Sequence, residues 1–179
     1  IMKLANVESV GISKNRDGKS INVFGDEVEI LAGKNYITEG IGDIRYDLKP
    51  KAFYQLNPSQ AIKLYKHVKG LLDFSKDKVI VDAYSGAGAI SMYLAPFVDR
   101  IIGIDSSKES VYSALHNKKI NKSTNVDFVL GEIKDALPKL YDKGLKPDVI
   151  ILDPPRSGLD RKTIDILQRK PINKIIYVS

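Results

Sequence analysis

The sequence predicts an α/β fold, namely a doubly wound and mostly parallel sheet preceded by part of a small β-rich domain. After residue 77, short apolar runs such as "KVIVDAY" and "PDVIILD" alternate with stretches whose apolar residues recur at helical spacing. This alternation is typical of βαβ units, whose right-handed crossovers build a parallel sheet. Before residue 50, short runs of alternating polar and apolar residues are separated by glycines, which is typical of strands and turns.

The first part of the chain is expected to be β-rich. Residues 8–25 contain two β-type runs around a polar turn that ends at Asp17-Gly18, a hairpin pattern. Further alternating runs follow, and the period of the apolar residues changes after Pro50. We therefore predict the remnant of a β-rich domain over residues 1–50 and a second domain over residues 51–179.

The second part is expected to begin with a helix and then to alternate. Asn57 is a favoured N-cap residue, and Pro58 suits the first helical position. Apolar residues then follow at the spacing of one helix face. Strand patterns, each followed by a helical stretch except the last, cover residues 78–84, 100–105, 126–131, 147–153 and 174–179.

Charge and composition restrict the class of protein. Residues 1–50 carry a net charge of −1 and residues 51–179 carry +7. A positive field favours a polyanion such as nucleic acid, although a lysine-rich solvated surface gives the same count. No run of 18 apolar residues and no signal-like segment occurs, which argues against a membrane partner and against secretion. The absence of cysteine excludes disulfides and cysteine-bound metal in this span, fits a cytoplasmic protein, and leaves no metal site to expect.

Polar residues gather where the predicted strands end, which is where ligands bind in such sheets. Asp82 lies near the end of the first strand, and Gly86 and Gly88 predict a tight turn that backbone and ligand can approach closely. Asp105 ends the second strand, where it could bind ribose hydroxyls or cap the next helix. Glu132 follows the third strand and could accept a hydrogen bond from an exocyclic amine or remain solvated.

The fourth strand runs into "DPPRSGL". Pro154 and Pro155 have no N–H donor and stiffen the loop, which would fix the Asp153 carboxylate at the mouth of the sheet. A purely structural Asp-Pro turn is the alternative. Methyltransferases that act on the amino group of adenine resemble this pattern, but they have an aromatic residue where this chain has Arg156.

Together these motifs resemble the S-adenosylmethionine-dependent RNA 5-methyluridine methyltransferases, which methylate C5 of uracil in ribosomal or transfer RNA. The matching segments are "FYQLN" (53–57), "DAYSGAG" (82–88), "GID" (103–105), "DPPRSGL" (153–159) and "YVS" (177–179). The resemblance implies a class I, Rossmann-like methyltransferase domain, S-adenosyl-L-methionine as the cofactor and RNA as the partner. Ribosomal RNA is favoured over transfer RNA, so the expected process is rRNA modification.

The resemblance also implies roles for individual residues. Gln55 and Tyr84 are expected to contact the cofactor, and Asp105 stands at the ribose-binding acid position. Asp153 corresponds to the acid at the junction of cofactor and target uracil, where it would position the base. The other expected cofactor contacts are Asp82, Gly86, Gly88 and Glu132.

The chemistry of uracil requires a group that the chain does not contain. C5 is a poor nucleophile until a thiolate adds to C6, and a base must later remove the C5 proton. The chain has no cysteine, and the resemblance implies that the nucleophile follows Ser179 and that an RNA-binding barrel precedes Ile1. The chain is therefore expected to be an inactive fragment that holds the cofactor site.

Three alternatives stay open at this point. The chain could be a module that binds the cofactor or nucleic acid without catalysis. It could be a nicotinamide-dependent oxidoreductase, although Ser91 stands where the dinucleotide pattern has its third glycine. It could also be an amino-methyltransferase acting on nucleic acid, which Arg156 disfavours.

Overall fold

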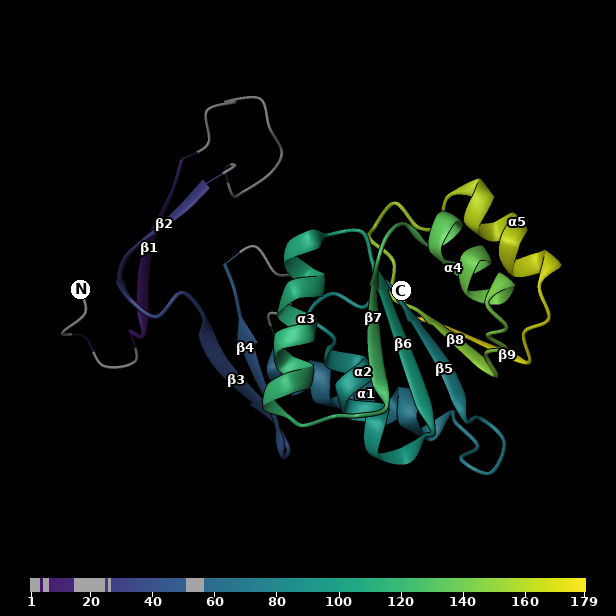
Figure 1. The fold of residues 1–179 in the computed structure, drawn as a ribbon. Helices are drawn as coiled ribbons and strands as arrows, with labels where there is room; N and C mark the ends of the chain where they lie inside the picture. Colours follow the sequence, from purple (N-terminus) through teal and green to yellow (C-terminus); the bar gives the residue numbers. More distant parts are fainter. Residues whose placement is uncertain (1–3, 5–6, 15–24, 26, 51–56) are drawn as a thin grey trace.

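A five-stranded parallel sheet forms the centre of the molecule (Figure 1). The computed structural model describes residues 4, 7–14, 25, 27–50 and 57–179. The strands lie in the order β7-β6-β5-β8-β9, and every neighbouring pair is parallel. The predicted doubly wound sheet is thereby confirmed. The strands are β5 (Val79–Ala83), β6 (Arg100–Asp105), β7 (Val126–Leu130), β8 (Val149–Leu152) and β9 (Lys174–Tyr177).

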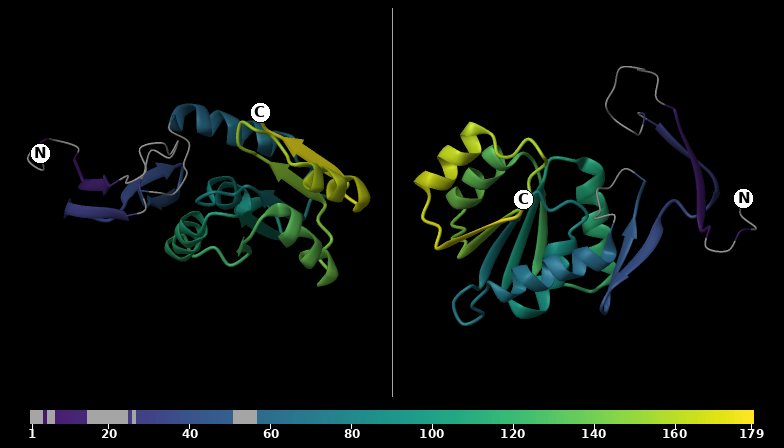
Figure 2. Two further views of the ribbon diagram at one scale, coloured as in Figure 1. Left: turned by 90° about the horizontal axis from the view of Figure 1, so that it is seen from above. Right: turned by 180° about the vertical axis from the view of Figure 1, so that it is seen from behind.

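Helices cover both faces of this sheet. The helices are α1 (Pro58–Gly70), α2 (Ala89–Leu94), the 3₁₀ turn η1 (Ala95–Phe97), α3 (Lys108–Ile120), α4 (Ile133–Asp142) and α5 (Arg161–Arg169). The helices α1 and α2 belong to one apolar core, whereas α4 and α5 pack on a second core on the other face. Figure 2 shows the sheet between the two layers.

Alternation along the strands separates the two cores. Ile80 of β5 faces the core of α1 and α2, whereas Val81 and Ala83 face that of α4. On β8, Ile151 and Ile150 divide in the same way. Successive side chains of a strand point to opposite faces, so a strand buried on both faces must be apolar throughout, as these runs are.

The hairpin β3 (Ile37–Ile41) and β4 (Ile44–Leu48) packs on the α1 and α2 side of the sheet. Gly42 makes its turn at a φ of 58°, a conformation that favours glycine. Ile41, Tyr46 and Leu48 join the same core as α1 and α2. The domain boundary at residue 50 stays a prediction, and this hairpin shares its core with the residues that follow the boundary.

A second hairpin, β1 (Ser9–Lys14) and β2 (Glu27–Gly33), lies beyond β3–β4 on the side away from the sheet (Figure 2). The structure pairs β1 with β2, which is further along the chain than the run that follows the predicted Asp17-Gly18 turn. That turn and the run after it lie outside the described residues.

The predicted start of α1 is confirmed. Asn57 is the N-cap, and its side chain accepts a hydrogen bond from the Gln60 N–H at 3.2 Å. Pro58 is the first residue of the helix. None of the helices within the described ranges is both long and apolar enough to cross a membrane.

Candidate functional site

The carboxyl ends of the central strands meet at one edge of the sheet. Ala83, the last residue of β5, pairs with Ile104 of β6 and with Leu152 of β8. The chain order reverses on either side of β5, and ligands bind at such a switch point in open α/β sheets. The residues that come next on these three strands are Tyr84, Asp105 and Asp153.

The turn after β5, which we call the glycine turn (residues 84–89), has three residues in the left-handed region. The φ angles of Tyr84, Gly86 and Gly88 are 65°, 55° and 82°. Tyr84 is not a glycine, so its conformation carries strain of the kind that is concentrated at functional sites. An added Cβ at Gly88 would lie 2.5 Å from Cζ of Phe128, so only glycine fits this position.

Asp105 braces the glycine turn. Its Oδ2 accepts from the Gly86 N–H at 2.8 Å, and its Oδ1 accepts from the Ser107 N–H at 2.8 Å. Ser107, rather than Asp105, is the N-cap of α3 and accepts from the Ser110 N–H. Each carboxylate oxygen can accept a second hydrogen bond, so Asp105 retains capacity for a ligand hydroxyl.

Asp82 is a buried carboxyl group with one unsatisfied oxygen. The residue is 1% exposed, and its Oδ2 accepts from the Ser91 hydroxyl at 2.6 Å. Its Oδ1 has no hydrogen-bond partner among the described residues. Burial raises the pKa of Asp82 to about 7, and the nearby charges of Asp153 and Asp105 add to this shift. The serine that replaces the third glycine of the dinucleotide pattern is thus the partner of Asp82.

A pocket of about 120 Å³ opens between the ends of β5, β6 and β7. Three of the predicted site residues, Tyr84, Asp105 and Glu132, lie together in its lining. The sequence did not indicate the other lining residues, which are Ser106, Gly131, Ile133 and Asp160.

Asp160 reaches this pocket because it caps α5. Its Oδ1 accepts from the Thr163 N–H at 3.0 Å, and its Oδ2 accepts from the Thr163 hydroxyl at 2.8 Å. Its only signal in the sequence is an N-cap pattern. The Tyr84 hydroxyl also interacts with Thr163, and the pKa of Tyr84 is raised by burial and by the Asp160 charge.

Two other predicted site residues, Glu132 and Asp153, were expected to present their carboxylates to a ligand. Glu132 forms an ion pair with Lys134, and this carboxylate raises the pKa of the lysine. Asp153 does not line the described pocket, although it is close enough for its charge to act on Asp82. The loop after it turns through a hydrogen bond from the Gly158 N–H to the Pro155 carbonyl at 2.8 Å.

Two larger hollows lie elsewhere. One of about 420 Å³ is bordered by Val79 and Arg100, where β5 and β6 begin, so it lies at the opposite edge of the sheet. The other, of about 540 Å³, borders α1 between Asn57 and His67. Neither contains a predicted site residue, and the described part of the chain has no cluster of metal-ligating side chains. Gln55 lies outside the described residues.

Known proteins match most of this chain in sequence. The model of the family described as tRNA (Uracil-5-)-methyltransferase matches residues 21–179. An "Uncharacterized RNA methyltransferase" of Enterococcus faecalis is 39% identical over 173 residues, which are 96% of this chain and 38% of that relative. A protein of the same name from Clostridium tetani is 36% identical over 171 residues, 95% of this chain and 37% of the relative.

A solved structure extends the likeness to three dimensions. The tRNA (uracil-54, C5)-methyltransferase of Pyrococcus abyssi in complex with S-adenosyl-L-homocysteine superposes with a TM-score of 0.79 at 29% identity. The alignment covers 98% of this chain and 42% of that one. The chain thus spans well under half the length of these relatives. By the match over residues 21–179, the chain belongs to the tRNA (uracil-5-)-methyltransferase family.

Proposed function

We propose that this chain is the cofactor-binding part of an RNA methyltransferase that transfers a methyl group from S-adenosyl-L-methionine to C5 of a uridine. One observation supports this above the others. The edge where β5, β6 and β8 end carries a strained glycine turn, an acid that braces it and a second, under-satisfied buried acid. Family membership supplies the reaction class.

The residues present fit the cofactor. The Asp82 Oδ1 near the end of β5 and the buried Ser85 hydroxyl in the glycine turn have no hydrogen-bond partners in the described structure. Asp105 would hold the ribose hydroxyls, and Tyr84 and Ile133 would pack against the adenosine in the pocket that they line. Pockets that enclose a whole drug-sized ligand measure roughly 300–1,000 Å³, so the 120 Å³ pocket would take a part of the cofactor.

The reaction needs groups from outside residues 1–179. When bound, the cofactor supplies an electrophilic methyl group on a sulfonium. A thiolate must add to C6 so that C5 can take this methyl group, a base must then remove the C5 proton, and the thiolate leaves. The chain has no cysteine, so the proposal places the nucleophile in a part of the whole protein beyond it. Asp153 would orient the uracil from its stiffened loop.

RNA is the proposed partner. Residues 51–179 carry a net charge of +7, and their positive electrostatic field would attract a polyanion. The expected preference for ribosomal RNA remains a prediction. The family and the Pyrococcus abyssi enzyme are both named for transfer RNA.

The test is methylation by the full-length protein. Purified enzyme is incubated with S-adenosylmethionine and with unmodified ribosomal or transfer RNA transcripts, and the digested nucleosides are analysed by mass spectrometry. We expect 5-methyluridine in one RNA class, and no product from residues 1–179 alone. Methylated adenosine in place of methylated uridine would instead support the amino-methyltransferase alternative.

A further inference from the structure

Two buried side chains reach the glycine turn from the side of the β3–β4 hairpin. Asn117 of α3 donates from Nδ2 to the Ala87 carbonyl at 3.1 Å. Tyr46 of β4 donates from its hydroxyl to the Ala89 carbonyl at 3.1 Å. Asn117 and Tyr46 are both 0% exposed, so bulk water does not compete for these bonds.

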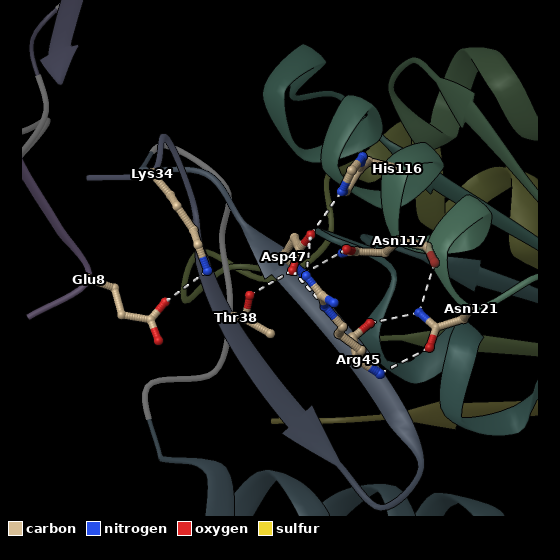
Figure 3. A network of polar contacts seen from close by, with 8 residues as sticks. All are labelled: Glu8, Lys34, Thr38, Arg45, Asp47, His116, Asn117 and Asn121. Carbon is tan, nitrogen blue, oxygen red and sulfur yellow. Dashed lines mark hydrogen bonds and ion pairs between the residues drawn. The ribbon is translucent and has the colours of Figure 1, made fainter. Parts of the chain in front are cut away.

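Asn117 also holds the hairpin. Its Oδ1 accepts from the Asp47 N–H at 2.8 Å, and Figure 3 shows its side chain directed at β4. Asn121, the C-cap residue that follows α3, accepts from the Arg45 N–H at 2.9 Å and donates to the Arg45 carbonyl at 2.7 Å. Both asparagines therefore tie the hairpin to α3, but it is Asn117 that continues to the glycine turn.

The bonds of the turn connect Asn117 with Asp105. The Ala87 carbonyl belongs to the peptide unit that ends at the Gly88 nitrogen, and this nitrogen donates to the Ser85 carbonyl at 2.8 Å. A planar peptide unit held at both its oxygen and its nitrogen cannot rotate. Its position fixes the preceding Gly86 N–H, which donates to Asp105 Oδ2.

We propose that Asn117 and Tyr46 are positioning residues for cofactor binding, acting through the glycine turn on the Asp105 carboxylate. This inference rests on the proposed function. The turn is strained at Tyr84, so its geometry persists where the surroundings hold it. Asp105 holds the turn through the Gly86 N–H, whereas Asn117 of α3 and Tyr46 of β4 hold it through the Ala87 and Ala89 carbonyls. The affinity for the cofactor therefore depends on these two hydrogen bonds to the glycine turn.

The experiment measures S-adenosylhomocysteine affinity by calorimetry on the same chain, well below its thermal midpoint. The variants are Asn117→Ala and Tyr46→Phe, and the matched control is Asn121→Ala, which loosens the hairpin without touching the turn. We expect about tenfold weaker binding for Asn117→Ala and about threefold for Tyr46→Phe, because each loses a buried hydrogen bond to the turn. Asn121→Ala should lower the thermal midpoint and leave the affinity unchanged.

The outcomes distinguish a failure of the proposed function from a failure of the positioning role. If the unaltered chain does not bind S-adenosylhomocysteine, the proposed function fails. If it binds, and Tyr46→Phe and Asn117→Ala bind as tightly, the positioning role is wrong and these residues serve stability alone. Equal losses of affinity in Asn121→Ala and Asn117→Ala would also overturn it. If Asn117→Ala does not fold, Tyr46→Phe decides, since it keeps the buried ring and loses only the hydroxyl.

Discussion

Two of the regions that bury a carboxyl group differ in how they satisfy it. At the interface of the β3–β4 hairpin and α3, Asp47 is 3% exposed and both of its oxygens have partners. These partners are Thr38, Arg45 and His116, at 2.8, 3.1 and 3.0 Å (Figure 3). At the strand ends, Asp82 is 1% exposed and has the Ser91 hydroxyl on one oxygen and no described partner on the other.

The pKa values follow from this difference. Burial raises the pKa of Asp47, but the hydrogen bonds from His116, Thr38 and Arg45 outweigh burial and hold it below its usual value. At Asp82, burial prevails and raises the pKa to about 7. A buried polar group with its partners in place stabilises the fold, whereas one that lacks them needs an explanation. We therefore interpret the interface as structural, and we propose that a ligand binds at the strand ends.

Removing the satisfied carboxylate should have the largest effect. Asp47→Ala is expected to lower the free energy of unfolding by about 3 kcal/mol at pH 7, because hydrogen bonds from three donors, each worth about 1 kcal/mol, are lost. Urea denaturation measures the loss. The folded pKa of Asp47 lies below its unfolded value of 3.8, so its contribution is present above about pH 4 and is lost as the pH falls further. A constant difference between wild type and variant down to acid pH would contradict the assignment.

The under-satisfied carboxyl group should respond to pH with the opposite sign. Its pKa rises from 3.8 to about 7 on folding, so its stabilising contribution is complete below about pH 4 and is lost as the pH rises through 7. Between pH 5 and pH 8 the wild type should lose roughly 2–3 kcal/mol more than Asp82→Asn, which cannot ionise. Parallel pH profiles of the two proteins would show that Asp82 is not buried as an acid.

Asp153→Asn should separate chemistry from cofactor affinity in the full-length enzyme. The asparagine keeps the size but loses the charge that we expect to accept the uracil N3–H. One charge-assisted hydrogen bond in the transition state is worth about 1.5–3 kcal/mol, or roughly ten- to hundredfold in rate. Single-turnover methylation measures the rate, and S-adenosylhomocysteine titration is the control. A wild-type rate would reduce Asp153 to a structural turn residue.

Removing an exposed carboxylate should have the smallest effect on the free energy of unfolding. Asp127 pairs with Lys118 at 2.9 Å and with Arg100 at 3.2 Å, but its side chain is 50% exposed. Solvent screens such pairs, so Asp127→Asn should cost less than about 1 kcal/mol in urea denaturation. A loss as large as that of Asp47→Ala would show that burial does not distinguish these carboxylates.

Most of the fold could be predicted from the sequence because local residue patterns determine its strands and helix starts. Strands buried on both faces are apolar throughout. The pair Asn57-Pro58 indicates where α1 begins. The pairing of β1 with β2 was not predicted, because turn residues such as Asp17-Gly18 favour a hairpin without specifying which runs pair.

Candidate site residues could be predicted from the sequence only where they lie at strand ends. Tyr84, Asp105 and Glu132 meet in one pocket because parallel strands end at the same edge. Asp160 was missed because its place depends on how the loop after Asp153 returns to the sheet. The bonds that Asn117 makes to Asp47 and Ala87 join positions 70 and 30 residues apart, and no sequence period indicates such contacts.

The most direct test of the central claim, that the strand-end edge holds the methyl donor, is calorimetric titration of residues 1–179 with S-adenosylhomocysteine and with NAD. The wild-type chain should bind S-adenosylhomocysteine and not NAD. Asp105→Ala should weaken that binding by about tenfold or more, because it removes both the ribose acceptor and the brace of Gly86. Binding of NAD without S-adenosylhomocysteine, or an Asp105→Ala variant with wild-type affinity, would contradict the account.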